Sequence, residues 1–436
     1  MSKPVLLKGG LLVTMNTKRE VFKGDILIEK NKIAKIAKNI SHSEARVVDA
    51  KNQFVIPGLI QSHIHLCQTL GRGMADDTQL LDWLETCIWP MESRHSAKSI
   101  QASAKLSILE MQKAGTTTIM DMATVHHTNE LLETVEESGL RYLGGKCMMD
   151  RKEHSGPLYE TTKDSLKEAE DLIKSWHKKN ELIDYALCPR FAVSCTEDLL
   201  LACGDLQKKY GVMIHTHAAE NKDEIALVKK LTGYDNIAYF EKLNLLNDKM
   251  IIAHGVHVTD EEVEMLVQRK AKIVHCPSSN LKLASGIAPI ESYRKRGICV
   301  GIGADGAPCN NCLDPFVEIR LAALLQKPLF GSEAMPAMSA LEMATIDGAR
   351  ALGKEDEIGS LEVGKLADIV CVDRSHPSVC TVENPYSALV YSCSGRDVAH
   401  TFINGKQVVK NFKSTIYDEE KVKSDAIAHT KKLFKN

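Results

Sequence analysis

The sequence predicts an α/β protein: a (β/α)₈ TIM barrel with a small β-sandwich domain formed by both termini. Three observations carry this prediction. Eight apolar strand candidates alternate with helical stretches in the middle of the chain, strand-rich segments occupy both ends, and a His, Asp or Arg residue follows each middle strand in turn. Alternating strands and helices are typical of parallel sheets, and eight units favour a closed barrel. A doubly wound open sheet is the second interpretation, because strand counts from sequence are easily wrong by one or two.

Short strands with tight turns are predicted at both ends of the chain. The N-terminal candidates are residues 5–7, 11–15, 25–29, 32–36 and 45–49, and the C-terminal ones are residues 367–373, 398–405 and 407–409. Two or three strands alone form no stable unit. We therefore expect one composite β-sandwich domain from residues 1–57 and 358–436.

The predicted barrel occupies residues 58–357, and its first strand is expected to begin slightly earlier. The strand candidates are residues 54–60, 117–120, 141–149, 185–188, 212–214, 250–253, 272–274 and 298–302. Residues 100–114 and 165–178 have apolar side chains at helical spacing, and residues 196–210 begin with Thr-Glu-Asp, a helix start signal. The C-terminal ends of all barrel strands meet at one mouth. Residues far apart in sequence can therefore share one site.

Composition excludes several functional classes. The chain has 436 residues, with 55 Lys+Arg against 57 Asp+Glu, and a net charge of −2. Such a balance lacks the basic field that nucleic acid or anionic lipid requires, so we expect neither partner. The sequence has no apolar run of membrane-spanning length and no signal-peptide pattern, which predicts a cytoplasmic protein. Thirteen cysteines lie mostly in apolar segments and are expected to be reduced.

Histidines at two strand ends predict a metal site. His63 and His65 stand two residues apart after an apolar run, so both side chains face the same side of a strand. His215 and His217 repeat this spacing, and we expect one of them to be a third ligand and the other to support it. Asp305 ends the last strand between two glycines. A catalytic zinc uses about three protein ligands and keeps a position for water.

Two other motifs are weak. The sequence Gly301-Ile302-Gly303 suggests a dinucleotide site, but the third glycine and the later acidic residue of that motif are missing. A serine nucleophile of the Gly-x-Ser-x-Gly type is excluded because the sequence contains no such motif. The metal-ligand constellation therefore stays the strongest functional signal in the residues themselves.

The assembled motifs resemble those of the amidohydrolase superfamily, in particular its aminohydrolase branch. The resemblance covers nearly the whole chain in the expected order. It rests on residues 57–65 (PGLIQSHIH), 115–118 (GTTT), 217–220 (HAAE), 253–255 (AHG), 275–283 (HCPSSNLKL), 303–306 (GADG) and 359–369 (GSLEVGKLADI). The resemblance implies the barrel, the composite β-domain and one divalent ion, zinc or in some members iron. The end of the fourth strand, residues 186–190, has no lysine, which implies a mononuclear site.

The resemblance also implies a role for each residue of the site. His63, His65 and His217 are expected as metal ligands with Asp305 as the fourth. Glu220 is expected to carry a proton to a ring nitrogen, and His254 to polarise the attacking water as a neutral donor. Asp305 is expected to take a proton from that water, so that a C–N bond is hydrolysed and ammonia leaves.

The resemblance implies two different substrate classes. Gln68, Arg190 and Phe191 resemble the residues that hold the purine in guanine deaminases, although a salt bridge is the simpler interpretation of Arg190. Residues 280–289 and 305–311 look more like deaminases of 5′-deoxyadenosine, methylthioadenosine and adenosylhomocysteine. We expect hydrolytic deamination of a purine ring, as a base or a nucleoside. An s-triazine hydrolase and a non-catalytic ligand-binding descendant are the alternatives, and the sequence leaves a homo-oligomer open.

Overall fold

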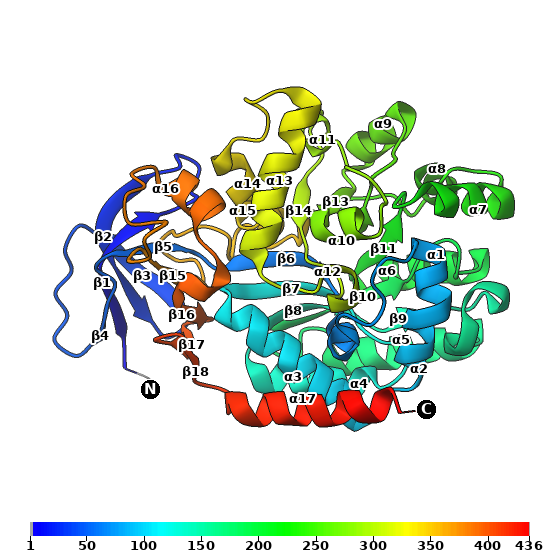
Figure 1. The fold of residues 1–436 in the computed structure, drawn as a ribbon, viewed down its shortest axis with the longest axis horizontal. Coiled ribbons are helices and arrows are strands. Elements are labelled where there is room, and N and C mark those ends of the chain that lie inside the picture. The colour runs from blue at the N-terminus through cyan, green and yellow to red at the C-terminus, as the bar shows by residue number, and fades with distance from the viewer. Residues whose placement is uncertain (1–2, 436) are drawn as a thin grey trace.

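The computed structural model describes residues 3–435 and contains two β-sheets of nine strands each. One sheet is the barrel in the centre of Figure 1, and the other is formed by both ends of the chain. The barrel strands are β6 (Leu59–Ile64), β7 (Thr116–Met122), β8 (Arg141–Gly145), β10 (Ile183–Pro189), β11 (Met213–Ala218), β12 (Met250–His254), β13 (Lys272–His275) and β14 (Val300–Ile302). They pair in parallel in this order, and the short strand β9 (Cys147–Met148) pairs with β10. The predicted (β/α)₈ barrel is confirmed.

The barrel closes between its first and last strands. Ile64 forms an isolated parallel bridge with Asp305, and the Asp305 N–H donates to the His63 carbonyl at 3.1 Å. A Cβ atom at Gly303 would lie 2.5 Å from that same carbonyl oxygen, so only glycine permits this approach. The closing contacts therefore lie among the residues predicted to bind metal.

Helices surround the barrel because its strands are buried on both faces, as in other parallel sheets. The predicted cap Thr196 accepts from the Leu199 N–H and starts α6. The larger helices are α3 (Ala97–Lys113), α4 (Thr128–Ser138), α5 (Thr162–Trp176), α6 (Glu197–Tyr210), α7 (Lys222–Thr232), α8 (Asn236–Lys242), α9 (Asp260–Arg269), α13 (Pro315–Phe330) and α14 (Ala337–Met343). Shorter ones are α1 (Leu80–Trp83), α2 (Trp89–Ser93), α10 (Pro277–Lys282), α11 (Ile290–Lys295), α12 (Ala307–Asn310), α15 (Ile346–Ala351) and α16 (Pro385–Ser387).

Both termini build the second sheet, which confirms the small composite β-domain. Its strands are β1 (Val5–Val13), β2 (Val21–Glu29), β3 (Lys32–Ala37), β4 (Arg46–Asp49), β5 (Gln53–Pro57), β15 (Ile369–Asp373), β16 (Val398–Ile403), β17 (Lys406–Lys410) and β18 (Lys413–Ser414). The antiparallel pair of β5 with β15 joins the two ends of the chain. Leu7, Ile26, Val55, Ile369 and Phe402 share an apolar core separate from that of the barrel. Hydrogen bonds connect all nine strands, so the domain is one continuous sheet.

The predicted strand at residues 54–60 is two strands in the structure. β5 belongs to the terminal sheet and β6 to the barrel, with Gly58 between them. A Cβ atom at Gly58 would collide with Thr117 of β7, so the chain passes closely from one sheet to the other at this point. An uninterrupted apolar run hides this junction in the sequence.

The last helix, α17 (Glu419–Leu433), lies along the barrel helix α3 rather than on the terminal sheet (Figure 1). Lys113 of α3 contacts Glu419 at 2.6 Å. The predicted domain boundaries after residues 57 and 357 stay a prediction. None of the helices within residues 3–435 is long and apolar enough to cross a membrane.

Candidate active site

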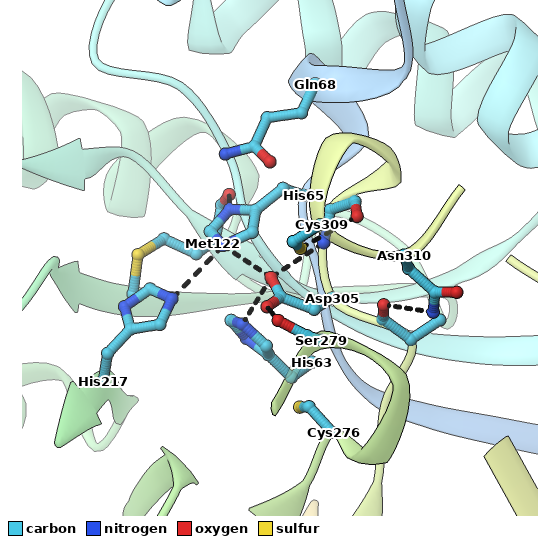
Figure 2. Close-up of polar contacts among 12 residues, drawn as sticks. His63, His65, Gln68, Met122, His217, Cys276, Ser279, Asp305, Cys309 and Asn310 are labelled. Carbon is cyan, nitrogen blue, oxygen red and sulfur yellow. Dashed lines mark hydrogen bonds and ion pairs between the residues drawn. The ribbon is translucent and has the colours of Figure 1, made fainter. Parts of the chain in front are cut away.

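Three histidines and one aspartate converge at the C-terminal ends of the barrel strands. His63 belongs to β6, His65 follows it, His217 belongs to β11, and Asp305 follows β14. One potential ligand atom from each lies within 4.8 Å of all the others. The Asp305 Oδ1 atom is 3.2 Å from His63 Nε2 and 3.3 Å from His65 Nε2, and Figure 2 shows these side chains facing one another. The structure therefore brings together all four residues predicted as ligands.

His215 and His217, the second histidine pair, make different contacts. His217 joins the group, with its Nε2 atom 3.2 Å from His65 Nε2. His215 instead places its Nε2 atom 2.7 Å from His63 Nδ1, on the side of that ring away from Asp305. The sequence left open which of the two histidines is the ligand. The geometry favours His217 as the ligand and His215 as the residue that supports His63.

Hydrogen bonds orient the ligand rings. The Nδ1 atoms of His65 and His217 each lie 2.8 Å from a backbone carbonyl, that of Met122 and that of Arg190 respectively. A ring that donates through Nδ1 presents the lone pair of Nε2 to the group. Burial lowers the pKa of His63 to about 4 and that of His65 to about 3, so both imidazoles are neutral at pH 7.

This donor set fits a divalent metal ion. Within residues 3–435 the buried His63 Nε2 atom has no hydrogen-bond partner, although it faces the group. Burial alone would raise the pKa of Asp305, but the adjacent His63 and other histidines hold it well below its usual value. Three neutral imidazoles and one carboxylate are ligands that zinc and similar ions accept.

Glu220 and His254 stand beside the ligand group. Burial, and then the charge of Asp305, raises the pKa of Glu220 well above its usual value, which favours the protonated form of this carboxyl. Its Oε2 atom is 3.4 Å from His254 Nε2, which is also 3.8 Å from Asp305 Oδ2. His254 therefore contacts both Glu220 and Asp305.

A pocket adjoins these groups. Its lining includes His65, His217, Glu220, His254 and Asp305 together with the predicted substrate residues Gln68, Arg190 and Phe191. Apolar side chains complete the wall: Leu80, Trp83, Leu84 and Leu283. A mostly apolar pocket with a few converging polar groups is the usual form of a small-molecule site.

Glu92 is a residue of this region that the sequence did not point to. Its buried carboxylate accepts from Gln68 Nε2 at 2.7 Å and from Arg190 Nη1 at 2.8 Å. Although burial opposes the charge of Arg190, the adjacent Glu92 raises its pKa above the usual value. Arg190 thus forms a salt bridge with Glu92 and also lines the pocket. The two interpretations of this residue, salt bridge and substrate contact, are therefore compatible. The only sequence signal was an acidic residue directly after the apolar stretch Trp89–Met91.

Other strand-end residues stay outside the pocket wall. Asp121 accepts from the Leu66 N–H at 2.9 Å and fixes the chain after His65. Asp150 accepts from the Thr196 N–H at 2.7 Å, where α6 begins. The buried ring nitrogens of His275 have no hydrogen-bond partner in the described part of the chain. A position at a strand end is therefore not sufficient for a place in the site.

A family model for the amidohydrolase family matches residues 54–408. Two relatives cover almost the whole chain. A 5′-deoxyadenosine deaminase of Methanosphaera stadtmanae is 38% identical over 410 residues, 93% of this chain and 94% of the relative. A 5-methylthioadenosine/S-adenosylhomocysteine deaminase of Carboxydothermus hydrogenoformans is 37% identical over 427 residues, 97% of this chain and 96% of the relative.

Solved structures of similar proteins share the entire fold. An adenosine deaminase from Xanthomonas campestris with bound zinc superimposes with a TM-score of 0.92 at 29% identity, covering 98% of each chain. The guanine deaminase of E. coli superimposes with a TM-score of 0.85 at 27% identity, covering 94% of this chain and 100% of that one. The relatives thus include deaminases of both substrate types that the sequence suggested.

Proposed function

Because this chain belongs to the amidohydrolase family, we propose that it is a metal-dependent deaminase that hydrolyses a C–N bond of a purine ring and releases ammonia. One observation carries the proposal: three residues of the ligand group, His65, His217 and Asp305, line the same pocket as Glu220, whose pKa is raised well above its usual value. Close relatives named as deaminases support the reaction class. The cytoplasmic location, the lack of nucleic-acid binding and any self-association belong to the same proposal.

His63, His65, His217 and Asp305 would hold one divalent ion. We propose zinc rather than iron, because three imidazoles and a carboxylate suit zinc and a similar structure contains it. When bound, the ion supplies a Lewis acid that makes a water molecule easier to deprotonate. The strand that would carry a second-site lysine ends instead in Pro189 and Arg190, which supports a single ion.

The residues of the chain supply the proton transfers. The protonated Glu220 can donate to a ring nitrogen, which makes the neighbouring ring carbon electrophilic. The ionised Asp305 accepts a proton from the attacking water as its oxygen adds to that carbon. A further proton then goes to the exocyclic amino group, the C–N bond breaks, and ammonia and the oxo product leave. Water and substrate together balance these products.

Polar groups opposite the ligand group would hold the ring. The amide nitrogen of Gln68 donates a hydrogen bond to Glu92. The Gln68 Oε1 atom is buried and has no hydrogen-bond partner in residues 3–435. Gln68 therefore offers an acceptor beside the donors of Arg190, a pair that matches the C=O and N–H of an oxopurine. The relatives named above act on adenosine-type nucleosides instead. The proposal is therefore a purine ring, as a guanine-type base or an adenosine-type nucleoside.

Ammonia release from a substrate panel tests this function. The zinc-loaded protein is given guanine, 8-oxoguanine, 5′-deoxyadenosine, methylthioadenosine, adenosylhomocysteine and melamine, with metal content measured in the same samples. We expect ammonia from at least one purine and none after chelation. A metal-loaded protein that binds a purine without turnover would favour the ligand-binding descendant. Faster attack on an s-triazine than on every purine would favour the triazine hydrolase.

A further inference from the structure

The short helix α10 holds two side chains of the site, and neither has a role in the chemistry described so far. Ser279 and Asn280 are adjacent on this helix, and both are buried. Ser279 Oγ donates to Asp305 Oδ2 at 2.7 Å, as Figure 2 shows. Asn280 Oδ1 lies 2.9 Å from His254 Nδ1. One helix thus contacts two groups that come from different barrel strands.

The Asn280 contact determines which nitrogen of His254 carries hydrogen. A carbonyl oxygen only accepts, so Nδ1 is the donor in this pair. In the neutral ring the Nε2 atom then has a free lone pair, and it faces Glu220 Oε2 at 3.4 Å. The Glu220 carboxyl and His254 Nε2 are therefore the two groups that face each other at this contact. With hydrogen on Nδ1, the neutral ring would present an acceptor to Glu220, which differs from the donor role that the sequence suggested.

The backbone makes this support necessary. His254 has a φ of 75°, a left-handed conformation that is strained for a residue with a side chain. The backbone of Asn280 is held in place, because its main-chain carbonyl accepts from the Ser285 N–H at 2.8 Å and from the Gly286 N–H at 3.3 Å. The loop after α10 is thereby tied to the residue that orients His254.

The two carboxylate oxygens of Asp305 have different neighbours. Its hydroxyl occupies Oδ2, while Oδ1 faces the Nε2 atoms of His63 and His65. Asp305 also has a left-handed φ of 61°. The Gly306 N–H donates to Oδ1 at 2.7 Å, and the serine hydroxyl at Oδ2 is the side-chain contact that further limits rotation of the carboxylate about its bond to Cβ. Both α10 residues therefore fix the direction of a group on a strained backbone.

We propose that Ser279 and Asn280 are positioning residues: Asn280 accepts a hydrogen bond from His254 Nδ1 and so turns Nε2 toward Glu220, and Ser279 helps to direct Asp305 Oδ1 to the metal ligands. The catalytic consequence rests on the proposed deaminase function. The tautomer and the metal contact are properties of the folded protein itself. They can therefore be measured apart from turnover.

Asn280 is tested with Asn280→Leu and Asn280→Asp in the zinc-loaded protein. Leucine removes the acceptor, so kcat should fall about 10- to 100-fold with an unchanged KM and full metal content. Aspartate keeps an acceptor at the same distance and should recover most of the loss. NMR of isotope-labelled histidine ring nitrogens, with His254→Gln to identify the signal, should find hydrogen on Nδ1 in the wild type and in Asn280→Asp.

The opposite results overturn the proposal. Hydrogen on Nε2 alone in wild-type His254 would show that Asn280 donates to this ring. An Asn280→Asp variant as damaging as Asn280→Leu would show the same. The NMR measurement on the wild type decides the tautomer even if Asn280→Leu does not fold. It also decides the tautomer if no compound of the panel is turned over, an outcome that would remove the deaminase function alone.

Ser279→Ala tests the second half by metal affinity rather than rate. Chelator competition should find zinc bound about 10- to 100-fold more weakly than in the wild type. Ser278→Ala is the matched control, because Ser278 lies on the same helix and its hydroxyl contacts Glu318 instead. Equal zinc affinities for the two variants would overturn the role of Ser279.

Discussion

A set of buried polar groups at the mouth of the barrel and a buried ion pair at its other end differ in their hydrogen bonds. At the mouth, the His63 Nε2, Gln68 Oε1 and Glu220 Oε1 atoms are buried and have no hydrogen-bond partner among residues 3–435. At the other end, the buried side chain of Arg141 on β8 donates to both oxygens of Asp368, at 2.9 and 3.0 Å, and to the Glu181 carbonyl at 3.0 Å. Asp368 also accepts from the Asn404 N–H at 2.7 Å.

This difference separates binding from stability. A buried polar atom without a partner costs about 1–3 kcal/mol, so several of them in one pocket indicate a place that a ligand completes. A buried ion pair with all its hydrogen bonds made needs no further partner. The Arg141–Asp368 pair connects the barrel to the terminal sheet, because Asp368 directly precedes β15. The four predictions below test whether the two ends really differ in this way.

The largest effect is expected from removing a ligand at the mouth. His217→Ala should lose the bound ion and reduce turnover to that of chelator-treated protein, since it removes one of the three imidazole ligands and leaves the site incomplete. Elemental analysis and ammonia release measure both. His376→Ala, at an exposed histidine outside the barrel, is the control and should change neither. Two ions per chain in the wild type, or full metal content in His217→Ala, would contradict the single site.

Glu220→Gln should separate proton transfer from metal binding. The amide keeps the shape of the side chain but cannot supply the proton, so kcat should fall about 10²- to 10⁴-fold. Metal content should stay at one ion per chain, because Glu220 lies outside the ligand group. Parallel metal analysis and steady-state kinetics check this prediction. A loss of the ion in this variant would make Glu220 a ligand instead.

At the opposite end, Arg141→Met should affect stability alone. Removing one partner leaves the Asp368 charge buried, which should lower the free energy of unfolding by about 3–5 kcal/mol. Denaturant titration measures the change, and kcat per folded molecule should stay that of the wild type. The double variant Arg141→Met with Asp368→Leu should recover most of the loss. A large fall in kcat of the folded single variant would end the contrast between the two ends.

The smallest effect is expected for Arg190→Lys at the mouth. Lysine keeps the charge beside Glu92 but loses the planar fork, so one acceptor of the substrate goes unpaired. The expected cost of about 1–3 kcal/mol corresponds to a fall of roughly 5- to 150-fold in kcat/KM for an oxopurine. A nucleoside held mainly through its ribose should be affected less. Wild-type kinetics on the best substrate would remove Arg190 from the binding site.

The parts predictable from sequence follow short-range rules. His63 and His65 could be paired because residues two apart on a strand share a face, and convergence at the mouth follows from the barrel itself. Glu220 and Asp305 needed the family resemblance, because a single carboxylate after a strand has no distinctive spacing. Their expected roles, like those of His254 and the substrate residues, stay predictions that the experiments above test.

The rest depends on contacts that no local pattern encodes. Glu92 reaches the site from α2, in the long segment between β6 and β7, and it follows no strand. Asn280 and Ser279 lay in a stretch used only for the resemblance, because their contacts to His254 and Asp305 appear only when α10 is folded. The division of residues 54–60 between two sheets was missed for the same reason. Apolar periodicity reports burial and does not report the sheet to which a strand belongs.

The closing bridge between Ile64 and Asp305 has a consequence for biosynthesis. Two of the metal ligands are made among the first residues of the barrel, and the last one is made more than 200 residues later. A ribosome releases the histidines of β6 long before Asp305 leaves the exit tunnel. The complete ligand set therefore cannot exist in a nascent chain that ends before β14, and full metal loading has to wait until the barrel is nearly finished. A translation pause late enough for Asp305 to have left the exit tunnel should be the earliest point at which a ribosome-bound chain retains the ion.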